Sequence, residues 1–171
     1  DQALLARFSE KIGTEVASPR DIALVDYFAE NPMAALDTLI EHAASDEASL
    51  VSYKIFPGQV SPETLDHVFG RQNMIVGFII RRRLDVYISY VKARENLVWH
   101  RADTSDFMPE IDVKDFLSWG KRNDAWYAES YALAVAKGLK PLVWSYAEDV
   151  DVGKENLMRR LASELTDRGV P

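Results

Sequence analysis

The sequence predicts an α/β fold in which helices flank a parallel sheet on both faces. Three short apolar runs have the character of strands, at Leu50–Phe56, Met74–Ile80 and Pro141–Trp144, and helical sequence separates each from the next. Strands that alternate with helices are typical of parallel sheets covered on both sides. The run at Met74–Ile80 is apolar throughout, as expected of a strand buried on both faces.

Capping residues mark where helices begin in the N-terminal half of the chain. The segment Ser18–Asp21 combines a capping serine, a proline at the first helical position and an acid three residues after the cap. Asn31–Pro32 and Ser61–Pro62 repeat the combination of a cap and a proline. We therefore predict helices near residues 2–12, 19–29, 32–44 and 62–69.

Apolar periodicity predicts further helices in the C-terminal half. The spacing becomes helical from near Leu84, directly after the second apolar run. A long helix fits Val113–Lys137 and ends before Gly138, and a last helix fits Lys154–Thr166. The length of 171 residues suits one domain with a hydrophobic core, so we expect a single domain over residues 1–171.

The composition excludes several classes of function. The chain is 47% hydrophobic and 27% charged, which is typical of a globular protein. It has no cysteine, which excludes disulfides, thiolate metal sites and a cysteine nucleophile and fits a reducing compartment. No apolar run is long enough to cross a membrane, and the net charge of −7 argues against nucleic-acid binding. We expect a cytoplasmic protein with a small-molecule partner, and the sequence leaves homo-oligomer formation open.

The charge is unevenly distributed along the chain. The segment Arg71–Arg101 contains seven basic and two acidic residues, so its formal charge is +5 although the whole chain has −7. A basic segment in an acidic protein indicates a site for a small anion. A solvated helix face is the more common reason for a run of charges, and it remains the alternative here.

Arginines follow directly after the predicted second strand, in the stretch Ile79–Ala93. Ligands of open α/β sheets bind outside the carboxyl ends of the strands, and the N-terminus of the following helix favours an anion. Ser89 lies one helical turn after Asp85, so the two residues share a face. We therefore expect Arg81, with its planar fork of donors, and Ser89, with its hydroxyl, to hold one phosphate.

This spacing resembles a motif of a known enzyme family. Arg81-x3-Asp85-x3-Ser89 is similar to the 3′-phosphate-binding motif of sulfotransferases that use 3′-phosphoadenosine 5′-phosphosulfate (PAPS). The resemblance implies that Arg81 and Ser89 bind the 3′-phosphate of the nucleotide, and that Asp85 caps the helix.

Two other segments extend the resemblance. Ala93–His100 resembles the segment ending in Trp-His in bacterial carbohydrate sulfotransferases of the trehalose 2-sulfotransferase type. Trp144–Val150 resembles the strand and Tyr-Glu-Asp segment of the same superfamily, interrupted here by Ala147. Trp99 and His100 are therefore candidates for binding the acceptor, by stacking on a sugar ring and by orienting a hydroxyl. Core packing of the indole and helix capping by the imidazole are the ordinary alternatives.

The resemblance implies a P-loop sulfotransferase-like enzyme that moves a sulfuryl group from PAPS to a hydroxyl of a carbohydrate or another small acceptor. Adenosine 3′,5′-bisphosphate would be the product, and no metal would be needed. The family's loop for the 5′-phosphosulfate has no counterpart in residues 1–50. We therefore expect a domain that is incomplete at its N-terminus, or a non-catalytic binding module on the same fold.

The catalytic residues are not assigned by the sequence. Phe56 stands where cytosolic members of the family have a histidine base shortly after the lysine that matches Lys54. Glu15 is a weak candidate for the glutamate base of the trehalose type. A kinase of the P-loop type is a third reading, but it would need a Walker loop and acidic Mg²⁺ ligands, and the sequence contains neither.

Overall fold

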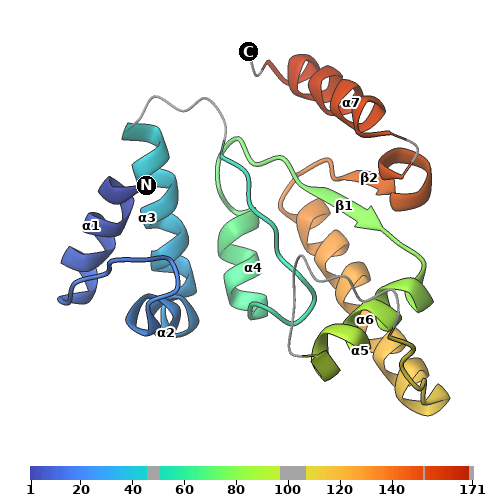
Figure 1. The fold of residues 1–171 in the computed structure, drawn as a ribbon. Helices are drawn as coiled ribbons and strands as arrows, with labels where there is room; N and C mark the ends of the chain where they lie inside the picture. The colour runs from blue at the N-terminus through green and yellow to red at the C-terminus, as the bar shows by residue number, and fades with distance from the viewer. Residues whose placement is uncertain (46–50, 97–106, 152, 170–171) are drawn as a thin grey trace. The chain divides into compact units, whose positions relative to one another are not determined.

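The computed structural model describes residues 1–45, 51–96, 107–151 and 153–169. The chain divides into two compact units (Figure 1). Unit 1 consists of Asp1–Arg71 together with Arg168–Pro171, and unit 2 consists of Gln72–Asp167.

Unit 1 is built from helices. They are α1 (Gln2–Ile12), α2 (Ile22–Glu30), α3 (Pro32–Ser45) and α4 (Pro62–Phe69). The ring of Phe8, which is 1% exposed, lies at the centre of the core, with its centroid 5.3 Å from that of Phe28. The other buried members of this core are Leu5, Val16, Leu24 and Ala35. The apolar faces of α1, α2 and α3 therefore hold these three helices together.

The starts of these helices follow the predicted caps, with one exception. Ser61 caps α4 by accepting a hydrogen bond from the Thr64 amide, and Pro62 is its first residue. Helix α2, in contrast, begins at Ile22 instead of residue 19. The Asp21 carboxylate accepts hydrogen bonds from the amides of Ser18 and Ala17, which also lower its pKa. This acid closes a turn ahead of the helix and so delays its start.

Unit 2 contains a two-stranded parallel sheet among the residues that the structure describes. Strand β1 (Gly77–Ile80) pairs with β2 (Leu142–Ser145), in a register that places Ile80 beside Ser145. The crossover between the strands includes two helices, α5 (Arg83–Asn96) and α6 (Val113–Ala136). A π-helix, η1 (Tyr146–Val150), follows β2 at once, and α7 (Lys154–Asp167) comes after it.

The two faces of this sheet are covered differently. On one face, the ring of Phe78 packs between Tyr127 and Tyr131 of α6, with centroids 6.2 and 5.7 Å apart. The Tyr127 hydroxyl also donates to the carbonyl oxygen of Ile79 at 3.3 Å. Neighbouring residues of a strand point to opposite faces, so Gly77 belongs to the other face, where the ring of Trp144 lies against it. Helix α6 therefore fixes one face, and the indole fills the space left by a missing side chain on the other.

The predicted fold class is wrong. The chain is mainly helical, and its short sheet is not flanked by helices on both faces. Residues 51–56 form no strand, although Tyr53 and Ile55 alternate with exposed neighbours, because none of the described strands pairs with them. Ile79 and Ile80 are 40% and 36% exposed, so β1 is not buried on both faces. An apolar run can predict that a strand forms, but it does not show whether other elements pack on both faces of that strand.

None of the described helices combines the length and apolar character that crossing a membrane requires.

We expect Gly77→Ala to destabilise unit 2. A Cβ at this position would lie 2.3 Å from the Cζ3 atom of Trp144, so the indole or the strand has to move. Overpacking of this kind costs about 1–3 kcal/mol, measurable by urea unfolding. Gly120→Ala is the matched control, because a Cβ on this α6 residue meets no atom within 4 Å. It should stabilise the helix by about 0.5–1 kcal/mol, and equal effects at both positions would contradict the packing described for Trp144.

Candidate functional site

The predicted phosphate site lies where β1 leads into α5. We call residues 80–85 the β1–α5 corner. Strand β1 ends at Ile80, and three arginines follow, the last of which begins α5. The amide of Val86 makes the first bond of the helix, to the carbonyl oxygen of Arg82 at 3.2 Å. The amides before Val86 belong to the first turn, whose N–H groups have no partner within the helix. They give this end of α5 a partial positive charge.

Two of the three consecutive arginines form ion pairs. Arg82 donates to both oxygens of Asp85 at 2.8 and 3.2 Å, and its side chain is 81% exposed. Arg83 is paired with Asp124 of α6, and its guanidinium lies 4.9 Å from the centre of the Tyr127 ring. These pairs neutralise both cations and connect the corner to α5 and α6.

Arg81 has a different environment. Its guanidinium carbon lies 4.5 Å from the centre of the Tyr146 ring, and the side chain is half-buried. Among the residues that the structure describes, no carboxylate pairs with it. The positive charge of Arg81 is therefore held in place without being neutralised, and its N–H donors remain available to an anion.

Ser89 lies where the sequence predicts, one turn after Asp85 on an exposed part of α5. Its hydroxyl donates to the carbonyl oxygen of Asp85 at 2.8 Å. No contact joins Arg81 to Ser89 in the described part of the chain, so the hydroxyl would have to rotate away from the helix backbone to donate to a phosphate. Its role in binding stays a prediction.

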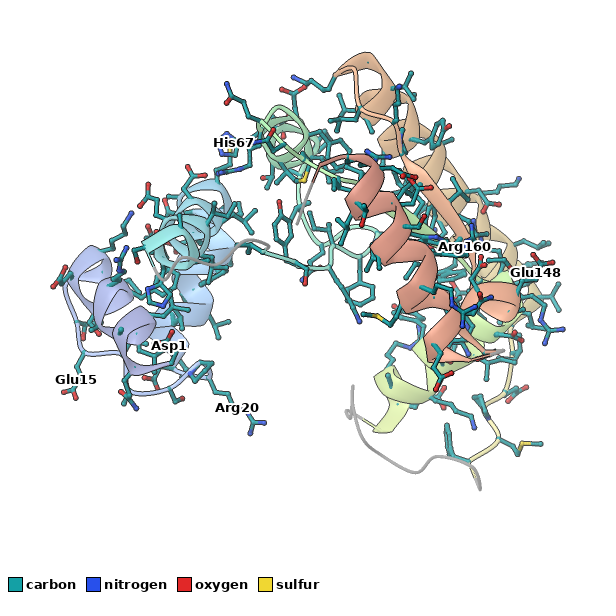
Figure 2. All side chains as sticks on the ribbon, turned by 90° about the horizontal axis from the view of Figure 1, so that it is seen from above. Asp1, Glu15, Arg20, His67, Glu148 and Arg160 are labelled. Carbon is teal, nitrogen blue, oxygen red and sulfur yellow. The ribbon has the colours of Figure 1, made fainter. Side chains whose placement is uncertain are left out.

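The end of β2 is stabilised by an acid. Asp149 of η1 is only 7% exposed, and its Oδ2 accepts a hydrogen bond from the Ser145 amide at 2.8 Å. Its other oxygen forms an ion pair with Arg160 of α7, which lies close to η1 in Figure 2. Helix α7 is thus fastened to the strand end beside the β1–α5 corner.

Helix α5 is held against α6 by an aromatic cluster. Tyr87 is 1% exposed, and its ring packs on Phe116 and Trp119 with centroids 5.2 and 5.3 Å away. Its hydroxyl donates to Asp115 at 2.6 Å. The pKa of Tyr87 is raised from 10.0 to about 12, mainly by this hydrogen bond and to a smaller extent by burial of the hydroxyl. The cluster fixes the direction in which α5 leaves the corner.

The other candidate residues lie outside the described residues or in unit 1. Trp99 and His100 lie outside the described residues. Glu15 and Lys54 are exposed residues of unit 1, and Figure 2 shows Glu15 in the segment between α1 and α2. No group of three or more acids and histidines within the described ranges is arranged to hold a metal ion.

Comparisons of the chain with known protein families, with characterised proteins and with solved structures find no match.

Sequence reasoning missed the partners that distinguish the three arginines. Tyr146 belongs to a segment that the sequence singles out, but nothing in the spacing links it to Arg81. The parallel register of β1 and β2 makes that link. Asp124 carries no distinguishing signal in the sequence, since acids are common on helix surfaces, and nothing in the segment around Asp149 predicted its pairing with Arg160.

We expect Asp115→Asn to lower the pKa of Tyr87 from about 12 back toward its ordinary value of 10.0. The folded chain holds this proton more tightly than the unfolded chain, so the stability it contributes is complete below pH 10 and is lost as the pH rises toward 12. Phenolate absorbance measures the titration, with Tyr87→Phe identifying the signal. An unchanged titration in Asp115→Asn would show that the carboxylate is not the cause.

Proposed function

We propose that the chain binds the 3′-phosphate of PAPS at the β1–α5 corner and transfers the sulfuryl group to a hydroxyl of a carbohydrate or another small acceptor. The observation that carries the proposal is the environment of Arg81. This half-buried cation lies at the carboxyl end of a parallel strand, and no carboxylate among the described residues pairs with it. Arginine in this position suits a phosphate because its planar donors match two phosphate oxygens at once.

The surroundings of Arg81 support a small anion. The first turn of α5 directs its amides to the same corner, and these favour a negative charge. The carboxylate of Asp85 also lies in this turn and would repel a phosphate, but its charge is compensated by Arg82. The corner therefore has a net attraction for an anion that depends mainly on one side chain.

The transfer step follows from the chemistry of PAPS. The acceptor oxygen attacks sulfur, the bond from sulfur to the bridging phosphate oxygen breaks, and adenosine 3′,5′-bisphosphate leaves. A base has to take the hydroxyl proton. Arg81 would hold the 3′-phosphate away from the reacting sulfur, so its contribution is to bind and orient the nucleotide.

A module that binds the nucleotide without transfer is the second candidate. The end of β2 favours it, because the exposed Glu148 follows that strand and its charge disfavours a second phosphate there. The β1–α5 corner would then be the whole of the anion site in this part of unit 2. Transfer of labelled sulfate from PAPS to a panel of sugars distinguishes the candidates, since binding without transfer supports the module.

Calorimetry tests the 3′-phosphate assignment. We expect tighter binding of adenosine 3′,5′-bisphosphate than of adenosine 5′-phosphate. Arg81→Gln should weaken binding of the bisphosphate by about 10- to 100-fold, because a hydrogen bond to a charged group contributes about 1.5–3 kcal/mol. The effect should shrink at high salt, which screens the attraction.

Arg82→Gln is the matched control for this experiment. It removes the same charge from the next residue, but Arg82 is exposed and already paired with Asp85. Affinity should change by about threefold or less, because solvent also screens the partly exposed Asp85 carboxylate that the substitution leaves unpaired. Equal loss in both variants would mean that the net charge matters and not Arg81 itself. Equal affinity of the wild-type chain for the two nucleotides would exclude a 3′-phosphate site.

A further inference from the structure

Tyr146 and Arg81 meet because of the register of the sheet. Ile80 and Ser145 are the last paired residues of β1 and β2, so the next residues, Arg81 and Tyr146, both leave the sheet at its carboxyl end. The guanidinium of Arg81 lies 4.5 Å from the centre of the Tyr146 ring. Both side chains are half-buried. The contact is therefore a consequence of strand pairing and not of proximity in sequence.

An aromatic ring acts on a cation differently from a carboxylate. Both hold the guanidinium in place, but a carboxylate cancels its charge and occupies its donors, as Asp85 does for Arg82. The ring attracts the cation through its quadrupole and carries no net charge. Arg81 is thus restricted by Tyr146 while its charge stays available to a ligand.

We propose that Tyr146 is a positioning residue for Arg81. The ring holds the guanidinium at the carboxyl edge of the sheet before an anion arrives, so that binding does not have to order a long, flexible side chain. This inference rests on the proposed function, because it assigns Tyr146 to the same anion site. Tyr146 acts through Arg81 and does not itself contact the phosphate.

Tyr146 is the first residue of the π-helix η1, and hydrogen bonds at this helix hold its backbone in place. Within η1 the Ser145 hydroxyl accepts a hydrogen bond from the Glu148 amide at 3.4 Å, and Asp149 accepts one from the Ser145 amide at 2.8 Å. Asp149 is buried and paired with Arg160. These bonds hold the backbone from which the Tyr146 ring extends to Arg81, so α7 supports the position of that ring through η1.

A double-mutant cycle with adenosine 3′,5′-bisphosphate tests the positioning role. Tyr146→Leu should weaken binding by about 3- to 10-fold, the expected effect of losing a cation–π contact that orders one side chain. Tyr146→Phe keeps the ring and should restore the affinity that the leucine variant loses. In an Arg81→Gln background, Tyr146→Leu should have no further effect, because the ring acts only through the arginine.

Each result of the cycle has a definite meaning. Failure of the wild-type chain to bind the bisphosphate overturns the proposed function and the role of Tyr146 with it. Binding by the wild-type chain that Tyr146→Leu leaves unchanged overturns the positioning role alone. An equal loss from Tyr146→Leu in the Arg81→Gln background would show that the ring contacts the nucleotide directly, which also contradicts the inference.

Nuclear magnetic resonance adds a measurement that needs no ligand and detects a misfolded variant. The side-chain protons of Arg81 should show ring-current shifts in the wild-type chain and in Tyr146→Phe, and lose them in Tyr146→Leu. The backbone signals of α5 and α6 around Tyr87 should stay unchanged in all three chains, which shows that unit 2 is folded. Arg81 protons at ordinary positions in the wild-type chain would contradict the contact on which the inference depends.

We also expect Arg160→Gln to lower the affinity for the bisphosphate by about 2- to 5-fold, because it leaves Asp149 buried without its partner and loosens η1. Arg159→Gln is the matched control, since Arg159 is an exposed neighbour on α7 without an ion pair in the described part of the chain. Equal affinity of the two variants for the bisphosphate would show that the ion pair of α7 with Asp149 does not contribute to binding.

Discussion

The parallel pairing of β1 with β2 is the interaction on which the rest of unit 2 depends. Only four residue pairs make it, yet it brings together two strand ends that are far apart in the sequence. Because the strands are parallel, the chain leaves both of them at the same end of the sheet, and a crossover has to connect them. Helices α5 and α6 lie in this crossover. Phe78 then packs on α6, and the aromatic cluster around Tyr87 holds α5 against the same helix. Without the register, neither the corner nor its aromatic neighbour would exist in this form.

Three consecutive arginines show how the environment assigns different roles to identical side chains. Arg82 lies on the exposed side of the corner and pairs with an acid one turn away. Arg83 turns toward α6 and connects two helices through Asp124. Arg81 remains beside a ring, with its charge uncompensated among the described residues. Two of the three arginines therefore form ion pairs, whereas the third contacts an aromatic ring.

Local signals in the sequence predicted local structure well. The helices near residues 2–12, 62–69 and 113–137 are confirmed to within a residue, because caps, prolines and periodicity act within one helical turn. The strands at residues 74–80 and 141–144 are confirmed in part.

Strand pairing depends on distant segments. The sequence therefore did not reveal that residues 51–56 have no partner among the described strands, and the expected α/β fold does not form. The partners of Arg81 and Arg83 lie on other elements and could not be read from spacing. The strand-to-helix corner around Arg81 involves only β1 and α5, so it forms although the expected wider sheet does not.

The hydrogen bonds at the end of the sheet have a consequence for association between molecules. The amide of Leu142 bonds to the carbonyl oxygen of Val76, so the alternation along β1 turns the Ile79 carbonyl toward the outer edge. The Tyr127 hydroxyl occupies that oxygen, and on the outer edge of β2 the Asp149 carboxylate occupies the Ser145 amide. Both outer edges thus lose a backbone group that a foreign strand would need at this end. Side chains near the corner thus make it harder for another strand to extend this short, half-exposed sheet.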